Sequence, residues 1–242
     1  MNQEKYNHIP LAPEQCVTGF GTTLIVAPHA DDESLGCGGV ISLLRKYGQL
    51  VSILLLSDGT LSHPNSKAYP LEKLRDLREK ELLDAAEILR VPPENIIFCR
   101  YPDRNVPTIH SEGFDGAVQN IAKLLAIVQP QSIFVPWRRD PHPDHRAAFQ
   151  IIEAADTAVA KIYEYPIWLE ELGVAGDEPT QEESIPFRLN ISQVLHQKQE
   201  AIAQHRSQIT DLISDDPEGF RLSPNMLSRF AVPYETFFIS KS

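Results

Sequence analysis

Two short polar clusters contain the residue types that could carry out chemistry. The first, Pro28-His29-Ala30-Asp31-Asp32-Glu33, follows an apolar stretch and precedes a glycine-rich turn. The second, Asp140-Pro141-His142-Pro143-Asp144-His145, follows another apolar stretch much later in the chain. Histidine nitrogens and carboxylate oxygens are ligands that zinc takes in proteins. Because the clusters hold more of these groups than one ion needs, the remainder could move protons, and the pattern indicates a metal-dependent hydrolase.

A catalytic zinc ion takes three protein ligands and keeps one position open for water. His29, Asp32 and His145 would supply two imidazoles and one carboxylate. A carboxylate beside the open position could take a proton as water attacks, and a histidine near the substrate carbonyl could stabilise the developing oxyanion, with a carboxylate to orient it. The candidates for these roles are Asp31, Glu33, His142 and Asp144.

Each cluster alone also has a simpler interpretation. Asp31, Asp32 and Ser34 could be capping and first-turn residues of one helix, and Asp144 could cap another. Both clusters, however, pair histidine with aspartate at the end of an apolar strand. In an open parallel sheet, ligands bind beyond the carboxyl ends of the strands, so both clusters would emerge at the same edge. The two clusters together therefore favour a metal site.

The apolar pattern predicts an α/β fold with a mostly parallel sheet, in one domain that spans residues 1–242. Continuous apolar runs are typical of strands covered on both faces. We expect such strands at Thr22–Ala27, Leu50–Ser57, Asn95–Arg100, Ser132–Pro136 and Lys161–Tyr165, with a weaker one at Thr236–Ile239. Helical spacing predicts helices over Gly38–Tyr47, Leu71–Leu89, Ala117–Val128, Asp144–Ala158 and Asn190–Ile213. Residues 63–70, 100–111 and 173–186 are predicted loops that could surround a site.

Composition excludes several classes of partner. The net charge is −11, from 22 basic and 33 acidic residues, so neither nucleic acid nor an anionic membrane is expected to bind. No apolar run is long enough to span a membrane, and the first residues lack the apolar core of a signal peptide. The three cysteines are widely spaced and form no disulfide framework, which indicates a cytoplasmic location. An uncharged or cationic small molecule is the expected partner.

The two clusters resemble the signatures of a known family. Pro28–Glu33 resembles the PHxDDE signature, and His142–His145 the HPDH signature, of the LmbE-like (PIG-L) N-acetylglucosaminyl deacetylases. Weaker matches lie at Arg78-x-x-Glu81, at Tyr101-Pro102-Asp103, and from Lys198 to His205-x-Ser207-Gln208. The chain departs from the family at Ala30, where proline is usual, and at Arg104, where the family's loop often has glycine. The second departure bears on the identity of the substrate.

The resemblance implies a Rossmann-like three-layer αβα sandwich that hydrolyses the N-acetyl group of a GlcNAc-type sugar or glycoconjugate. It implies that zinc, or another divalent ion such as Fe²⁺, is bound by His29, Asp32 and His145. Asp31 then matches the general base that acts on water, and His142 matches the group that stabilises the oxyanion, with Asp144 holding it. The positions near the substrate sugar are Arg78, Asp103 and Arg104. We expect His142 to act as a protonated imidazole that shares the oxyanion's charge with the metal.

Other functions fit parts of the same pattern. An amidase acting on a non-acetyl amide conjugate would use the same groups. A non-haem Fe(II) oxygenase also takes two histidines and one carboxylate, although it usually builds them on an all-β barrel. A binding module without catalytic activity would be expected to lack the base or the oxyanion group, and Asp31 and His142 are both present. The sequence leaves the oligomeric state open, a homo-oligomer included.

Overall fold

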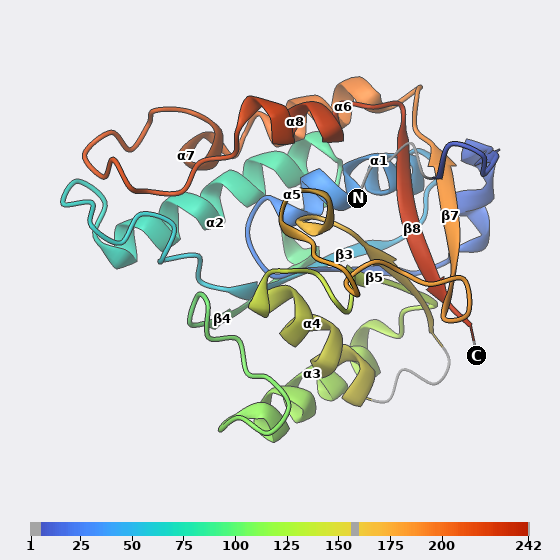
Figure 1. The fold of residues 1–242 in the computed structure, drawn as a ribbon, viewed down its shortest axis with the longest axis horizontal. Coiled ribbons are helices and arrows are strands. Elements are labelled where there is room, and N and C mark those ends of the chain that lie inside the picture. Colours follow the sequence, from blue (N-terminus) through green and yellow to red (C-terminus); the bar gives the residue numbers. More distant parts are fainter. Residues whose placement is uncertain (1–5, 156–159, 242) are drawn as a thin grey trace.

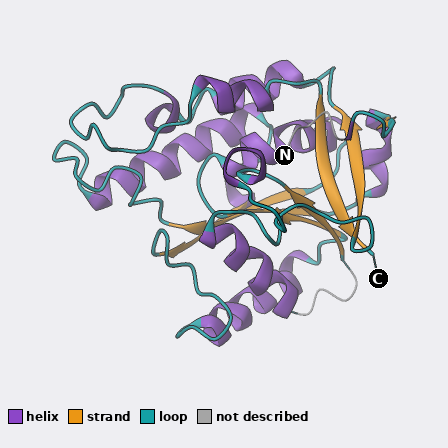
Figure 2. Ribbon diagram, in the orientation of Figure 1, coloured by secondary structure: helices purple, strands orange, loops and turns teal. Residues whose placement is uncertain are grey.

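The computed structural model describes residues 6–155 and 160–241, and its strands form a single eight-stranded sheet in the order β1-β7-β8-β6-β5-β2-β3-β4 (Figure 1). Helices cover both faces of this sheet, which gives three layers (Figure 2). The strands are β1 (Leu11–Ala12), β2 (Thr23–Ala27), β3 (Val51–Ser57), β4 (Ile96–Tyr101), β5 (Ser132–Pro136), β6 (Lys161–Tyr165), β7 (Ser184–Asn190) and β8 (Tyr234–Ser240). The predicted α/β fold with a mostly parallel sheet is confirmed.

The helices alternate with the parallel strands as the apolar pattern predicts. They are α1 (Asp32–Lys46), α2 (Leu71–Ile88), α3 (Phe114–Val128), α4 (Pro143–Ala154), α5 (Leu169–Leu172), α6 (Leu195–Ile202), α7 (Arg206–Ile209) and α8 (Pro224–Phe230), with short 3₁₀ turns at η2 (Glu14–Gly19) and η3 (Pro93–Asn95). The helix expected over Asp144–Ala158 ends at Ala154, and residues 156–159 lie outside the described part of the chain. None of the helices described here is both long and apolar enough to cross a membrane.

The continuous apolar strands have two buried faces, as their sequences predict. Ile25 and Phe134 belong to a core shared with α1, α2 and α6, whereas Val26 and Ile133 belong to a core shared with α3 and α4. Side chains alternate between the two faces of a strand, so a strand that is apolar throughout can fill both cores.

The order of the central strands brings the two polar clusters together. β2 pairs with β3 on one side and with β5 on the other, and all three strands are parallel. The chain thus turns in opposite directions from the carboxyl ends of β2 and β5, which is the topological switch point where ligands bind in such sheets. The loops that carry His29 and His142 leave the sheet at this point.

The glycine-rich stretch after the first cluster allows α1 to pack closely against its neighbours. A Cβ added at Gly36 would lie 2.3 Å from the ring of Tyr165 in β6, and one added at Gly39 would lie 2.6 Å from the Ile191 side chain. The glycines therefore sit inside α1, which begins at Asp32 rather than at the predicted Gly38.

The C-terminal part of the chain differs from its predicted structure. The single helix expected over Asn190–Ile213 is wrong: α6 ends at Ile202 and a separate turn, α7, starts at Arg206. His205, between the two helices, contacts Glu33, and Ser207, within α7, donates to Glu81. Buried polar contacts thus fix a break that helical periodicity alone does not reveal. The loop predicted over 173–186 gives way to β7 at Ser184.

Candidate metal and catalytic centre

The predicted site residues gather around one cavity of about 250 Å³ at the carboxyl ends of β2 and β5. His29, Asp31 and Asp32 line it from the end of β2 and the start of α1, and His142 lines it from the loop before α4. Arg78, Asp103 and Arg104 also line it. Asp144 and His145 lie behind this surface and are almost fully buried.

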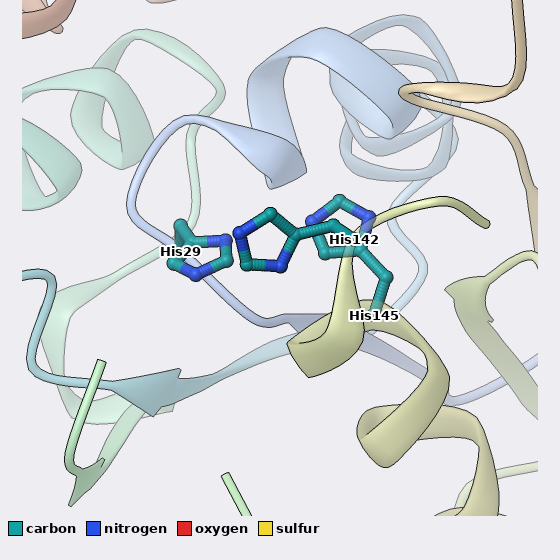
Figure 3. A group of neighbouring side chains, drawn as sticks. All are labelled: His29, His142 and His145. Atoms are coloured by element: carbon teal, nitrogen blue, oxygen red, sulfur yellow. The ribbon is translucent and has the colours of Figure 1, made fainter. Parts of the chain in front are cut away.

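The three predicted ligands are in mutual contact. The Asp32 Oδ2 atom lies 3.3 Å from His29 Nδ1 and 3.2 Å from His145 Nε2. In a tetrahedral zinc site with bonds of about 2.0–2.1 Å, neighbouring ligand atoms lie about 3.3–3.4 Å apart, so these separations fit such a site. Figure 3 shows the imidazoles of His29, His142 and His145 grouped together, and nitrogen atoms of the three lie within 4.8 Å of one another.

The second nitrogen of each predicted imidazole ligand faces a carboxylate. His29 Nε2 lies 3.1 Å from Asp144 Oδ2 and 3.3 Å from Asp103 Oδ1. His145 Nδ1 lies 3.1 Å from Asp140 Oδ1. Metal-binding histidines usually have such a partner, which fixes the ring orientation and makes the ligand more basic.

The electrostatics of the cluster suit a cation. Burial would lower the pKa of His145, but Asp32 and Asp140 outweigh burial and raise it to about 9. Burial would likewise raise the pKa of Asp32, but His145 and His29 hold that pKa well below its usual range. The carboxylates are thus balanced by protons on imidazoles. A divalent ion would supply the same positive charge, because ligation requires the imidazoles to give up those protons. The residues present therefore fit a divalent metal ion.

Asp31 has an unusual backbone conformation, with φ 141° and ψ −29°, beside the cavity. It occupies the N-cap position of α1, yet its side chain makes no capping hydrogen bond, so the simple capping interpretation does not apply. Its Oδ2 atom lies 3.7 Å from Arg78 Nη2. Burial raises the pKa of Asp31 to about 7, against the opposing charge of Arg78. Strained backbone of this kind persists only where its surroundings hold it, and it is concentrated at functional sites.

The surroundings of His142 favour its neutral form, in contrast to the expected protonated imidazole. Burial, followed by the charges of His29 and His145, lowers the pKa of His142 to about 3. Its Nδ1 atom accepts a hydrogen bond from the main-chain N–H of Asp144 and so caps α4. A neutral ring whose Nδ1 is an acceptor carries its proton on Nε2. His142 therefore offers one neutral N–H donor.

The carboxylate of Asp144 does not hold His142, and that expectation is corrected. Asp144 accepts hydrogen bonds from the main-chain N–H groups of Arg104 and Val106, at 2.7 and 3.2 Å, and contacts His29 Nε2. The contact between Asp144 and His142 is made by the main chain of Asp144 instead. Helix α4 starts at Pro143, which turns the Asp144 side chain toward the loop after β4.

The three predicted sugar-contacting residues have different surroundings. The guanidinium of Arg78 is buried and donates to the carbonyl oxygens of Gly59 and Ala30. Asp103 is also buried, and accepts from the main-chain N–H of Leu61 in addition to contacting His29. Arg104 is exposed at the edge of the cavity. Arg78 and Asp103 thus have structural partners of their own, whereas Arg104 is free to reach a ligand.

Sequence reasoning missed a buried network behind Asp31. Glu33 Oε2 accepts the main-chain N–H of Asp31 at 3.0 Å, and Glu33 Oε1 contacts Ser34 Oγ at 2.6 Å and His205 Nε2 at 2.8 Å. The contact between Asp140 and His145 is a second feature that the sequence did not predict. The signal was present in part, because Glu33 and Asp140 belong to the two clusters. His205 lies far along the chain, and only the fold shows its contact.

The sequence profile of the PIG-L family, described as GlcNAc-PI de-N-acetylase, matches residues 24–156, more than half of the chain. The chain belongs to this family. The match runs from β2 to the end of α4 and so includes both polar clusters. The chain is therefore a deacetylase of the PIG-L family, a hydrolase of amide C–N bonds. Membership and the α/β fold both disfavour the iron-oxygenase alternative.

Individual relatives resemble the chain beyond the family match. A probable N-acetyl-alpha-D-glucosaminyl L-malate deacetylase 2 of Bacillus cereus is 28% identical over 201 residues, which is 79% of this chain and 86% of that protein. A diacetylchitobiose deacetylase of Thermococcus kodakarensis is 29% identical, over 78% of this chain and 70% of that protein. The structure of N,N'-diacetylchitobiose deacetylase from Pyrococcus horikoshii superimposes with a TM-score of 0.68 at 23% identity, over 99% of this chain and 92% of that one, and so shares the fold.

Proposed function

We propose that this protein is a zinc-dependent hydrolase that removes the acetyl group from an N-acetylglucosaminyl sugar or glycoconjugate. The observation that carries the proposal is the contact of Asp32 with both His29 and His145 beside the cavity, with Asp31 next to it. The family membership and the two relatives named as deacetylases support the same substrate class. The nitrogen and oxygen donors suit zinc, and Fe²⁺ could occupy the same ligands.

The roles of the residues follow from their positions. His29, Asp32 and His145 would hold a divalent ion, which would supply Lewis acidity to the amide carbonyl and to the attacking water. The Asp31 carboxylate takes a proton from the attacking water and delivers it to the departing nitrogen, as a general base and then a general acid. Water adds to the amide carbon, the C–N bond breaks, and acetate and a free amine leave.

His142 and the carboxylates behind the site complete this scheme. The Nε2–H of His142 donates to the carbonyl oxygen as negative charge develops there. Asp140 orients the ring of His145, and Asp103 and Asp144 orient the ring of His29. In this role Asp144 supports a metal ligand rather than the oxyanion group.

The test is acetate release from a panel of N-acetylated sugars, measured without oxygen on metal-stripped protein and after zinc is restored. We expect no turnover by the stripped protein and turnover by the zinc-loaded protein. Acetate release at the same rate by both would refute the role of the metal. A folded, zinc-loaded protein that releases acetate from none of the sugars would refute the proposed substrate class.

The neighbouring aspartates provide a sharper test of the roles. Asp31→Asn should keep zinc and lose turnover on the order of a hundredfold or more, as expected when a general base is removed. Asp32→Asn should lose zinc. If Asp31→Asn lost the metal while Asp32→Asn kept it, the two assignments would be reversed.

A further inference from the structure

The cavity has two chemically different sides. The side formed by residues 29–104 and by His142 carries the charged groups described above. Residues after position 160 supply the rest of the lining, and most of their side chains are apolar: Ile167, Trp168, Leu172, Phe220 and Leu222, with Gln208 as the polar member. We call these five apolar residues the apolar wall. All five lie outside the part of the chain that matches the family profile.

The apolar wall is a built surface and not a chance exposure. The rings of Trp168 and Phe220 pack edge to face, with centroids 5.7 Å apart. The N–H of Phe220 donates to the carbonyl oxygen of Ser62 at 2.7 Å, and that of Leu222 to the carbonyl oxygen of Gln208 at 2.8 Å. These bonds hold the segment that follows α7 against the cavity.

The apolar wall is also tied to the metal ligands through one residue. The Oδ2 atom of Asp140 accepts the main-chain N–H groups of Ile167 and Trp168, at 3.1 and 2.9 Å, while its Oδ1 atom lies 3.1 Å from His145 Nδ1. The start of the apolar wall thus has a fixed position relative to the predicted metal ligand. A molecule whose amide reaches the predicted metal site can therefore place another of its groups on the wall.

A second sugar ring would fit the apolar wall only in part. It could stack its C–H face on Trp168 or Phe220, but among the residues after position 160 only Gln208 offers its hydroxyl groups an amide partner. A carboxylated substituent would be equally poor there, because none of the five residues carries a positive charge, and the cations that line the cavity are Arg78 and Arg104. Aliphatic and aromatic surface, in contrast, gains free energy when it is buried against such a wall.

We propose that the substrate carries an apolar aglycone, an alkyl or aryl group attached to the N-acetylated sugar, and that this group binds the apolar wall. This inference rests on the proposed function, because it assumes that the amide is cleaved at the charged side. The exposed position of Leu172, whose surface is 57% accessible, allows the aglycone to extend from the cavity toward solvent.

The test compares kcat/KM for the methyl and phenyl glycosides of N-acetylglucosamine and for a glycoside that bears a carboxylate. We expect the zinc-loaded enzyme to prefer the phenyl over the methyl glycoside by on the order of tenfold or more, the size of discrimination that apolar contacts give. Equal kcat/KM for the phenyl and methyl glycosides, or a preference for the carboxylate, would overturn the inference while leaving the proposed function intact.

Matched variants test whether the apolar wall causes the preference for the phenyl glycoside. Leu172→Ser should reduce the ratio of kcat/KM for the phenyl glycoside to that for the methyl glycoside. Leu50→Ser, which changes another exposed leucine directly before β3, should leave this ratio unchanged. A ratio that both variants change equally, or that neither changes, would contradict the assignment to the apolar wall. Both leucines are exposed, so neither substitution threatens the fold.

Binding can be measured without catalysis. Phenyl glucosaminide has no acetyl group, so its binding does not depend on the deacetylation. It should change the fluorescence of Trp168 and lose this effect in Trp168→Phe, in which the fully buried Trp137 remains. If phenyl glucosaminide binds but the protein cleaves no acetylated sugar, the proposed function fails and the assignment of the apolar wall stands. The inference would be overturned if phenyl glucosaminide gave no fluorescence response at concentrations at which the acetylated phenyl glycoside saturates turnover.

Discussion

The parallel part of the chain, residues 23–154, and the C-terminal part, residues 161–240, make different contributions to one cavity. The first supplies every predicted metal ligand and the charged groups around them. The second supplies the apolar wall and buried polar side chains such as His205. The family profile matches the first part and ends where the second begins. The two proposals above thus assign the reaction chemistry to the first part and recognition of the aglycone to the second.

The largest effect should follow loss of a metal ligand in the parallel part. His145→Gln removes an imidazole that has no exposed surface, and we expect the purified protein to lose zinc and all measurable turnover. Metal content of the folded variant, measured by elemental analysis, is the readout. His196→Gln is the control, since the His196 side chain is 82% exposed and far along the chain from the clusters. Full zinc occupancy in His145→Gln would show that the ligand set is wrong.

A smaller effect is expected when the donor to the oxyanion is removed. His142→Asn keeps a residue type that caps helices well but is too short to place a donor where Nε2 lies. We expect the activation barrier to rise by roughly 2–4 kcal/mol, as when one oxyanion donor is deleted. This change lowers kcat and leaves KM almost unchanged. Unfolding temperature, compared with the wild type, checks that the helix cap is kept. A nearly unchanged kcat would exclude His142 from this role.

The next effect tests whether His205, in the C-terminal part, affects catalysis through its contact with Glu33. Glu33→Gln weakens the network that joins His205 to the main-chain N–H of Asp31 and holds the strained backbone there. We expect kcat to fall on the order of tenfold with zinc and KM retained, because small misplacements of a reacting group are costly.

Glu81→Gln is the matched control for this variant. Glu81 is also buried and accepts two hydrogen bonds from Ser207, but the structure gives it no contact with Asp31. Equal loss of kcat in both variants, at equal loss of stability, would mean that Glu33 has a structural role only.

The smallest expected effect concerns an ion pair between the two parts. Arg139, after β5, pairs with Glu183, before β7, and lowers the pKa of Glu183 from its usual 4.5 to about 2. A depressed carboxyl pKa stabilises the fold above pH 4.5, and this contribution is lost as the pH falls toward 2. Both side chains are partly exposed, so Glu183→Gln should lower Tm by only about 1–2 °C at pH 7 and by less at pH 3. A Tm difference that grew on acidification would contradict this.

The sequence also predicts the strands of the parallel part better than those of the C-terminal part. In the parallel part, β2, β3 and β5 are largely apolar and buried on both faces, so their sequences indicate their places. These three strands, together with β4 and with β6 at the start of the C-terminal part, appear within a residue or so of the predicted bounds. In the C-terminal part, β7 reads Ser-Ile-Pro-Phe-Arg-Leu-Asn, with exposed and polar positions, and gives no such signal. The break between α6 and α7 depends on His205 reaching Glu33 across the fold.

The candidate site shows a comparable limit. The types and spacing of His29, Asp32 and His145 identify three residues that the fold brings together, because the segments that carry them follow β2 and β5, which are neighbours in the sheet. Sequence could not reveal which neighbour each side chain faces. The Asp144 carboxylate contacts His29 because Pro143 starts a helix and turns it away from His142, a consequence of local geometry rather than of residue spacing.

The separation of chemistry from substrate selection is tested most directly by measuring kcat and KM for the phenyl glycoside with Asp31→Asn and Phe220→Ser. We predict that Asp31→Asn loses on the order of a hundredfold or more in kcat while its KM stays within about twofold. Phe220→Ser should raise KM by on the order of tenfold and keep most of its kcat. The opposite result, a raised KM for Asp31→Asn and a reduced kcat for Phe220→Ser, would contradict the division of the cavity into a reactive part and a selective part.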